Sequence, residues 1–377
     1  MNDKILKIGV DLRPLLGGKV SGVENYIKET LTALLKLDQR NHYYFWVNGH
    51  AHFEFPAFLK KRNTTCFQTH YPNKFLNLSL SLGGFPKIDR FFPEPIDVFW
   101  MPDPRPVAVS RNVKLITTFH DLSPELCSEC FNFKTRLWHK LLNLRKIAQK
   151  SDRLIAVSGA TRRDLMKHYN IAGEKIEIIY EAPVGDLKPA RKAEITRVCK
   201  KYKIEKPYLL TLSTLEPRKN LEKLILGYSF ARALLKFPYK LVVAGINNKK
   251  IFAEMPSLQS EGVIFTGFIP EEDKSGLYTG AEFFINVSLL EGFGLPVAEA
   301  VACGTPCLVS GGSSLTEVAG KAGVTVDPKR VSSIARGIQD LVKNPKLLSD
   351  LRKNTKAQAK KFSWEKTAEE TLAILTN

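Results

Sequence analysis

The chain has 377 residues, of which 44% are hydrophobic and 25% are charged, a composition that excludes a disordered protein and leaves room for two globular domains. The formal net charge of +18 suggests an anionic partner, but it is spread over both halves, and no basic tail or basic-aromatic motif favours nucleic acid. No apolar run of about 18 residues and no signal-peptide core are present, which predicts a cytoplasmic protein.

Short apolar runs alternate with helical patterns along the whole chain, which predicts parallel sheets covered by helices. Residues 22–38 follow the first apolar run and carry apolar side chains at helical spacing, so the chain opens with a strand and a helix. The strands expected in the first half are residues 5–12, 43–48, 96–101, 114–121, 153–158 and 175–180. After a polar stretch with two prolines, the strands expected are residues 208–213, 240–245, 262–268, 281–288 and 305–311.

Two successive α/β domains, each a doubly wound parallel sheet, are the simplest interpretation of this alternation. The boundaries we predict are 1–190 for the first domain, 200–361 for the second, and 362–377 for a closing helix that packs back toward the first domain. In such sheets, ligands bind outside the carboxyl ends of the strands, so polar residues that directly follow a strand are the candidate site residues.

The segment EGFGLPVAE, residues 291–299, places two glutamates around a glycine turn between a strand and a helix. Glycine lets the backbone turn and approach a ligand, Pro296 suits the first helical turn, and the free N–H groups of that turn attract an anion. Glu291 lies in the loop and Glu299 in the helix, so we expect them to reach different parts of one ligand. The alternative is that Glu299 pairs locally and Glu291 is solvated.

Three further segments place polar or flexible residues after strands. In LSTLEPRKN, Arg218 and Lys219 are suited to clamp a diphosphate, or form an exposed basic turn. In TTFHDLS, His120 is suited to contact a sugar hydroxyl with Asp121 orienting its ring, or the two form a structural pair. The loop after the first strand can approach a ligand or simply turn, because it contains Gly17, Gly18 and Gly22.

The six cysteines are expected to be reduced thiols rather than a disulfide framework, because the chain is long and is expected to stay in the cytoplasm. Cys303 and Cys307 lie within apolar sequence. Cys127 and Cys130 form a CxxC motif, but no second pair and no histidine cluster accompanies it. The sequence therefore predicts no metal site.

These segments, in their order and spacing, resemble the retaining nucleotide-sugar glycosyltransferases of family four, which includes mannosyl- and glucosyltransferases. The resemblance covers nearly the whole chain and extends to RLIAVSGATRRDL, VIFTGFIPEED and FSWEKTA. It implies the GT-B fold, with two Rossmann-like doubly wound domains facing a cleft. Residues 1–190 would be the acceptor-side domain, and residues 200–361 would bind the nucleotide sugar. The reaction would need no metal or other cofactor.

The resemblance also assigns a role to each candidate residue. Glu291 would meet hydroxyls of the transferred sugar, and Arg218 and Lys219 would hold the diphosphate. Glu299 would hold the ribose, and His120 would approach the sugar from the other domain. The remaining donor-binding positions are Gly17, Gly18 and Gly22 in the first loop, Gly267, Phe268 and Ile269 near the base, and Gly292, Phe293, Gly294 and Leu295 near the sugar and phosphate.

The expected reaction transfers a sugar, best guess mannose from GDP-mannose, to a hydroxyl of a glycan or a polyprenyl-linked glycan, as in polysaccharide biosynthesis. UDP- and ADP-sugars stay open as donors. A sugar-nucleotide epimerase-like enzyme is one alternative, but it would not be expected to combine EPRKN with EGFGLPVAE. A non-enzymatic polyanion-binding protein is another, and it would explain the charge but not the strand-end residues.

Residues 133–150 predict a basic amphipathic helix, with six lysines and arginines, no acid and apolar residues at helical spacing. Its apolar stripe either packs on the sheet of the first domain or lies on an anionic membrane surface. An enzyme that extends a lipid-linked acceptor would benefit from membrane contact. A peripheral location at the inner membrane face is therefore a further expectation.

Overall fold

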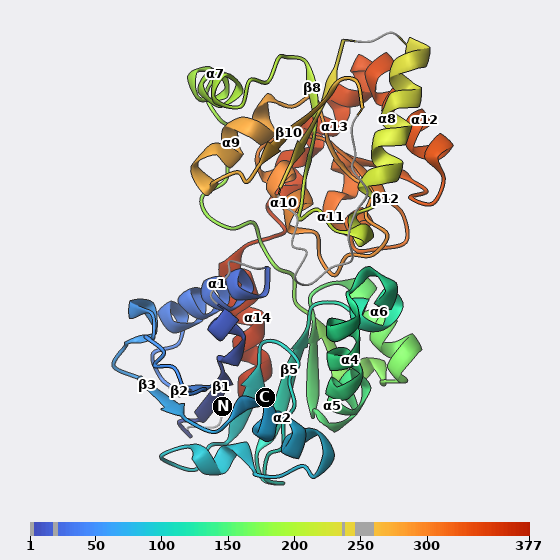
Figure 1. Ribbon diagram of the computed structural model, residues 1–377. Coiled ribbons are helices and arrows are strands. Elements are labelled where there is room, and N and C mark those ends of the chain that lie inside the picture. Colours follow the sequence, from blue (N-terminus) through green and yellow to red (C-terminus); the bar gives the residue numbers. More distant parts are fainter. Residues whose placement is uncertain (1–3, 18–21, 236–237, 246–259) are drawn as a thin grey trace. The chain divides into compact units, whose positions relative to one another are not determined.

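The computed structural model describes residues 4–17, 22–235, 238–245 and 260–377 (Figure 1). The chain divides into two compact units, which we call unit 1 and unit 2. Unit 1 consists of Met1–Leu122, Leu137–Glu181 and Ser363–Asn377, and unit 2 consists of Ser123–Arg136 and Ala182–Phe362. Ser123–Arg136 thus groups with unit 2, although it lies within the predicted first domain.

Unit 1 is built on a seven-stranded parallel sheet with the order β3-β2-β1-β4-β5-β6-β7. The order reverses beside β1, which makes the sheet doubly wound, as predicted. The edge strand β3 is not among the predicted strands, because its mixed sequence TTCFQT has no apolar run. The strand is only half-buried. The strands are β1 (Lys7–Asp11), β2 (His42–Asn48), β3 (Thr64–Thr69), β4 (Val98–Met101), β5 (Lys114–Phe119), β6 (Arg153–Ala156) and β7 (Ile176–Ile178).

The core of unit 1 joins the first and last helices to the sheet. Tyr26 of the first helix is fully buried, and its ring meets that of Trp364 at 6.2 Å between centroids. Thr367 donates a hydrogen bond from Oγ1 to the carbonyl of Tyr180 at 2.6 Å. These contacts explain why the last residues group with unit 1. The helices are α1 (Gly22–Leu37), α2 (Asn73–Leu82), α4 (Phe133–Leu142), α5 (Leu144–Lys150), α6 (Gly159–Tyr169) and α14 (Trp364–Thr376). The first residues of α4, up to Arg136, group with unit 2.

The predicted basic helix over 133–150 is divided into α4 and α5 at Asn143. Asn143 has a left-handed backbone, with φ of 46°, and its side chain accepts a hydrogen bond from the backbone N–H of Lys146, which caps α5. α5 buries Leu144, Ile147 and Ala148, whereas α4 buries none of its residues. No helix in the described part of the chain combines the length and hydropathy needed to cross a bilayer.

Unit 2 is built on a six-stranded parallel sheet with the order β10-β9-β8-β11-β12-β13, flanked by helices on both sides (Figure 1). Its order reverses beside β8, so unit 2 is doubly wound as well. The strands are β8 (Tyr208–Leu212), β9 (Lys240–Ala244), β10 (Val263–Gly267), β11 (Phe284–Asn286), β12 (Cys307–Ser310) and β13 (Gly323–Val326). The helices are α3 (Ser123–Leu126), α7 (Lys192–Lys201), α8 (Leu221–Leu235), α9 (Glu271–Gly280), α10 (Leu295–Ala302), α11 (Leu315–Ala319), α12 (Val331–Lys343) and α13 (Pro345–Ala359).

Short 3-10 helices connect several of these elements, and two of them belong to segments that the sequence singles out. η1 ends at Gly17 in the glycine loop, and η6 contains Arg218 and Lys219. The 3-10 helices are η1 (Arg13–Gly17), η2 (Ala57–Leu59), η3 (Ile88–Phe91), η4 (Ser128–Cys130), η5 (Gly173–Lys175), η6 (Pro217–Lys219) and η7 (Gly320–Ala322).

The prediction that all six cysteines are reduced is wrong for one pair, because Cys127 and Cys130 form a disulfide. The turn from α3 into η4 brings the two sulfurs together, and both cysteines are buried in a small apolar cluster with Phe131 and Leu290. This cluster explains why Ser123–Arg136 groups with unit 2. Glu129 adds a ligand atom within 4.8 Å, but metals bind thiolates rather than a disulfide. The remaining cysteines are free thiols, namely Cys66, Cys199, Cys303 and Cys307.

Candidate active site

The charged candidates of unit 2 lie in two loops that follow neighbouring strands. Arg218 comes after β8 and Glu291 after β11, and these strands pair in parallel, so their carboxyl ends lie at the same edge of the sheet. The backbone N–H of Leu289 donates to the carbonyl of Arg218 at 2.8 Å, which ties the two loops together. Arg218 Nη1 lies 3.2 Å from Glu291 Oε2. The structure therefore brings together residues that are 73 positions apart in the sequence.

Glu291 is buried and ionised. Lys219 Nζ lies 2.5 Å from its Oε1, and the hydroxyl of Ser288 donates to the same oxygen at 2.9 Å. Burial alone would raise the pKa of Glu291, but Lys219 and Arg218 outweigh burial and lower the pKa to about 2. The alternative of a solvated Glu291 therefore does not describe this structure, in which only 7% of the residue is exposed.

Glu216 is a further member of the same cluster, and the sequence patterns assign it no role. Its carboxylate lies 2.6 Å from Arg218 Nε and 3.9 Å from Lys219 Nζ, and the residue is almost completely buried. Burial raises the pKa of Glu216, and the two neighbouring cations oppose that rise. The available signal is its position two residues before Arg218 in a strand-end loop. Two cations are thus held between two buried carboxylates.

The glycine turn before α10 has the geometry that its sequence predicts. Gly294 has φ of 101°, and a Cβ atom there would lie 2.4 Å from Cδ2 of Leu315, so the position requires glycine. The hydroxyl of Ser314 donates to the carbonyls of Glu291 and Phe293 at 3.0 and 2.8 Å, which fixes the turn. No side chain caps the start of α10. Pro296 has no N–H, and the N–H of Val297 donates to the carbonyl of Gly294 at 2.9 Å, so the N–H of Leu295 is the donor of this first turn best suited to an anion.

Glu299 lies inside α10, where two side chains of α9 hold it. Lys274 Nζ lies 3.0 Å from its Oε1, and the hydroxyl of Tyr278 donates to Oε2 at 2.7 Å. Burial raises the pKa of Glu299, although Lys274 and Tyr278 favour the ionised form. Glu299 is thus paired with side chains 21 and 25 positions earlier in the sequence rather than with near neighbours in its own segment. The two glutamates have different partners.

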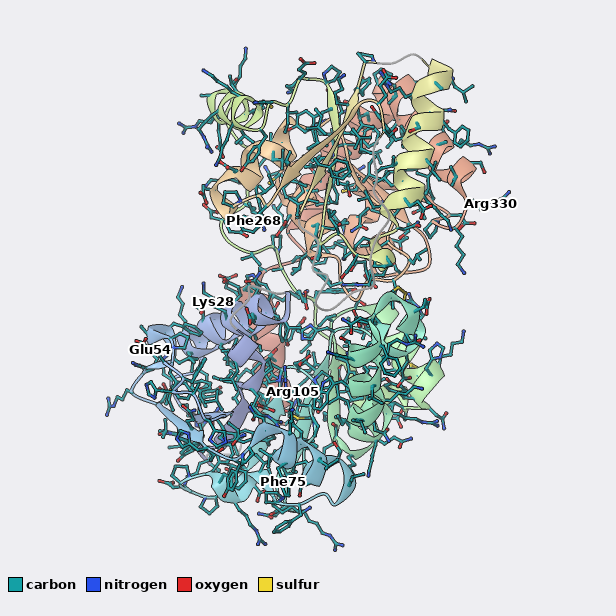
Figure 2. All side chains as sticks on the ribbon, in the orientation of Figure 1. Lys28, Glu54, Phe75, Arg105, Phe268 and Arg330 are labelled. Atoms are coloured by element: carbon teal, nitrogen blue, oxygen red, sulfur yellow. A yellow bond between two sulfur atoms is a disulfide. The ribbon has the colours of Figure 1, made fainter. Side chains whose placement is uncertain are left out.

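The end of β10 combines an unusual backbone with an exposed aromatic ring. Gly267 has φ of 73°, and the register with β9 shifts between Phe265 and Gly267. Ile269 turns inward and is buried, whereas 68% of Phe268 is exposed (Figure 2). Exposed aromatic rings can stack on nucleobases. This arrangement fits a base-binding position.

His120 of unit 1 is held by two partners and is protonated. Its Nδ1 lies 2.9 Å from Glu181 Oε1, and its Nε2 donates to the carbonyl of Pro102 at 2.9 Å. Burial lowers the pKa of His120, but the bond to Glu181 outweighs burial and the pKa is raised to about 9. The prediction that Asp121 orients the ring is therefore wrong. Glu181 does so, and it follows β7, which local sequence could not reveal.

The glycine loop of unit 1 is described only in part. Gly17 ends η1, and Gly22 is an exposed residue that begins α1. Gly18 lies outside the described residues. The structure therefore adds no ligand-binding geometry to the predicted role of these three glycines.

Both halves of the chain match known glycosyltransferase families. Residues 195–358 match the family Glycosyl transferases group 1, and residues 20–182 match Glycosyltransferase Family 4. Over 267 residues, the chain is 31% identical to O-antigen chain mannosyltransferase B of Escherichia coli, an alignment that covers 70% of each protein. The chain belongs to the family-four glycosyltransferases. This confirms the predicted family and leaves the epimerase-like and polyanion-binding alternatives without support.

Other relatives of this glycosyltransferase are longer. Over 270 residues, it is 32% identical to the serotype-specific mannosyltransferase WbdA of Escherichia coli, and the alignment covers 68% of this chain but 32% of WbdA. The aligned part of the chain therefore spans about a third of that protein.

Solved structures confirm the predicted GT-B fold. A glycosyltransferase from Rickettsia africae matches with a TM-score of 0.69 and 16% identity, over 99% of this chain and 98% of that one. Anabaena HepE in complex with UDP and glucose matches with a TM-score of 0.68 and 16% identity, over 99% and 100% of the two chains. At such identities the likeness shows the fold.

Proposed function

We propose that this glycosyltransferase moves mannose from a nucleoside diphosphate sugar to a hydroxyl of a glycan or lipid-linked glycan. The donor we propose is GDP-mannose, and the reaction would retain the configuration of the sugar and need no metal. The observation that carries the proposal is the buried cluster of Arg218, Lys219 and Glu291 beside the uncapped start of α10. The names of two relatives, O-antigen chain mannosyltransferase B and WbdA, support mannose as the transferred sugar. The complex of HepE with UDP-glucose supports a nucleotide-sugar donor.

Arg218 and Lys219 would bind the diphosphate of the donor together with the backbone N–H of Leu295 at the start of α10. Arginine bonds phosphate oxygens in a planar fork, whereas lysine acts as a point charge. When the bond between the sugar and the diphosphate breaks, negative charge grows on the leaving phosphate. Fixed cations in a buried site stabilise that charge without reorganising, which lowers the barrier. This division of labour would make a metal unnecessary.

Glu291 would orient the sugar rather than transfer a proton. With a pKa of about 2 it stays ionised at neutral pH, so it can accept hydrogen bonds from sugar hydroxyls but cannot act as a general acid. Its bonds to Lys219 and Ser288 hold the carboxylate in place. A sugar hydroxyl that bonds to Glu291 would therefore be held in a fixed position relative to the diphosphate on Lys219.

Retention of configuration would follow from a front-face route. The bond from the anomeric carbon to the diphosphate breaks, and its electron pair goes to the phosphate oxygen. The acceptor oxygen bonds the same carbon from the same face, and its proton passes to the leaving phosphate. This route needs no carboxylate nucleophile of the kind that retaining glycosidases use.

The remaining donor contacts follow from the ends of β10 and α10. Glu299 would accept hydrogen bonds from the ribose hydroxyls while Lys274 and Tyr278 hold it. The exposed ring of Phe268 would stack on the base. The ring of His120 is protonated and its two N–H groups are bonded to Glu181 and to the carbonyl of Pro102, so it does not enter the proposal as a base.

The test is a nucleotide screen followed by a transfer assay. We expect GDP to raise the melting temperature more than UDP or ADP, since a ligand at 100 times its Kd stabilises the native state by about 2.7 kcal/mol. GDP-mannose should then give a product with retained α configuration, measured by NMR. Stabilisation by none of the nucleotides would contradict the donor site, a preference for UDP would contradict GDP-mannose, and an inverted product would contradict retention.

A further inference from the structure

Helix α4 exposes its apolar residues to solvent. None of the residues in Phe133–Leu142 is buried, and 76% of Phe133 is exposed. Leu137 and Leu141 continue the same stripe at spacings of four residues, and Trp138 lies beside them. A helix in a globular protein normally turns such a stripe toward the core. The stripe of α4 therefore lacks the core contacts that the stripe of α5 has.

Helix α2 carries a second exposed stripe. Leu76 and Leu80 are buried, whereas Phe75, Leu78 and Leu82 are exposed, with 77% exposure for Phe75 and 74% for Leu82. Phe75 lies at the surface of unit 1 (Figure 2). The spacing 75, 78, 82 places these three side chains on one face of the helix. α2 thus has two apolar faces, of which only one contacts the core.

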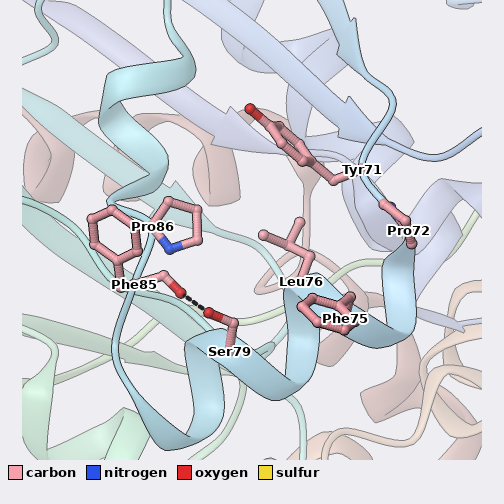
Figure 3. A pocket seen from close by; sticks show the side chains of 7 residues that line it. All are labelled: Tyr71, Pro72, Phe75, Leu76, Ser79, Phe85 and Pro86. Carbon is pink, nitrogen blue, oxygen red and sulfur yellow. Dashed lines mark hydrogen bonds between the residues drawn. The ribbon is translucent and has the colours of Figure 1, made fainter.

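A hollow of about 450 Å³ opens beside the exposed stripe of α2 (Figure 3). A hydrogen bond from the hydroxyl of Ser79 to the carbonyl of Phe85 joins the helix to the loop that follows it. Phe85 is itself 62% exposed. The lining is almost entirely apolar and consists of Tyr71, Pro72, Phe75, Leu76, Ser79, Phe85 and Pro86.

Lysines lie beside helix α2. Lys146 of α5 donates from Nζ to the carbonyl of Ser81 in α2 at 3.4 Å, which places α5 beside α2. Burial, and then the positive charges of Lys146 and Lys87, lower the pKa of Lys150, so these three lysines lie near one another. Residues 70–88 and 130–151 contain no aspartate or glutamate. The charged side chains of these two segments are therefore all basic, although Asp121 and Asp103 lie near His139 of α4.

We propose that this region docks on an anionic lipid bilayer. The docking face consists of Phe75, Leu78, Leu82, Leu137, Trp138 and Leu141 as the inserting residues, with Lys87, Arg145, Lys146 and Lys150 as the cations. Apolar and aromatic side chains enter the boundary between headgroups and acyl chains, while lysines and arginines bind the anionic headgroups. The proposal is independent of the sugar and the nucleotide that the enzyme uses.

Helix α8 of unit 2 provides an internal comparison. It also exposes a stripe, Leu226, Phe230 and Leu234, but acids accompany it. Arg232 is paired with Glu261 at 2.7 Å, and Glu222 lies in the first turn of the helix. Such a mixed surface is not attracted to anionic lipid. Charge therefore selects the docking face of unit 1 over the stripe of α8.

The test is sedimentation of the full chain with phosphatidylcholine vesicles that either contain or lack phosphatidylglycerol. We expect binding only to vesicles with phosphatidylglycerol, weakened by moderate salt. Changing Arg145, Lys146 and Lys150 together to Gln should weaken the partition by about 10²-fold, at about fivefold for each charge. Phe75→Gln with Leu82→Gln should abolish it.

The matched control is Leu226→Gln with Leu234→Gln on α8, which should bind as the unchanged protein does. All these side chains are exposed, and circular dichroism with nucleotide-dependent melting checks that each variant is folded. Sedimentation with neither vesicle, equal sedimentation with both, or loss of binding in the α8 control would overturn the proposal. The proposal would also be overturned if light scattering showed a dimer for the unchanged protein and a monomer for the variant with Phe75→Gln and Leu82→Gln. The face would then bind a second copy of the chain.

Discussion

Unit 1 and unit 2 are both parallel sheets whose strand order reverses once, but they arrange their charges differently. In unit 2, Arg218 and Lys219 are mostly buried between Glu216 and Glu291 at the ends of two neighbouring strands. Around α2 and α5 of unit 1, exposed lysines stand beside exposed apolar side chains, with no acid in either segment. The same residue types thus build a site in one unit and a surface in the other.

The difference predicts effects of different size. Removing one member of a buried charge cluster leaves its partners uncompensated and is costly, whereas an exposed cation contributes little to folding. Substitutions in the cluster of unit 2 should therefore change catalysis and stability strongly. Substitutions in the lysines of unit 1 should change membrane affinity alone.

The largest effect is expected for Lys219→Ala in the cluster of unit 2. It removes a cation from the proposed diphosphate site and leaves Glu291 with one fewer partner, so turnover should fall by roughly 10²-fold or more. The turnover of Glu291→Ala should fall by a similar factor, because the sugar loses the carboxylate that orients it. Lys223→Ala, four residues later in the first turn of α8, is the control for transfer assays. Near-normal turnover of Lys219→Ala would refute the assigned site.

The next largest effect is expected on the stability of unit 1, from the buried ion pair between His120 and Glu181. The pKa of His120 is raised to about 9, so the pair stabilises the fold fully below the ordinary histidine pKa of about 6.5, and this contribution is lost as pH rises through 9. Glu181→Gln should therefore lower the free energy of unfolding by about 2 kcal/mol at pH 6, and much less at pH 10. Urea denaturation at both pH values measures this. An equal loss at both would show that the pair is not ionic.

A smaller effect is expected for Glu216→Gln, which tests whether this buried carboxylate positions Arg218. The amide keeps the shape of the side chain but loses the charge that fixes the guanidinium, so KM for the donor should rise about tenfold, with a smaller change in kcat. Steady-state kinetics separate the two constants. An unchanged KM together with a lowered melting temperature would make Glu216 a purely structural residue.

No effect is expected from chelation. If cationic side chains and helix N–H groups neutralise the leaving diphosphate, turnover should survive saturating EDTA. Loss of activity that magnesium or manganese restores would show instead that unit 2 needs a metal in addition to its own cations.

The sequence predicts the fold and part of the site because both depend on local patterns. Apolar runs mark the buried strands, and ligands bind outside strand ends, so Arg218, Lys219 and Glu291 could be proposed as site residues, with their roles taken from the family resemblance. The edge strand β3 could not be predicted, because it is only half-buried and its sequence lacks an apolar run.

The pairings of the charged residues could not be predicted, since they join distant parts of the chain. His120 meets Glu181 across 61 positions, and Lys274 meets Glu299 across 25. The break between α4 and α5 escapes prediction for a different reason. Periodicity counts apolar positions and does not detect that one residue, Asn143, adopts a left-handed backbone.

Calorimetric titration of GDP tests most directly whether the buried cations of unit 2, rather than the exposed cations of unit 1, hold the diphosphate. We predict that Arg218→Ala weakens GDP binding by at least about tenfold, because a charge-assisted hydrogen bond contributes about 1.5–3 kcal/mol. Lys146→Gln should bind GDP as the unchanged protein does. Unchanged affinity in Arg218→Ala, or loss of affinity in Lys146→Gln, would contradict the account and move the nucleotide site elsewhere.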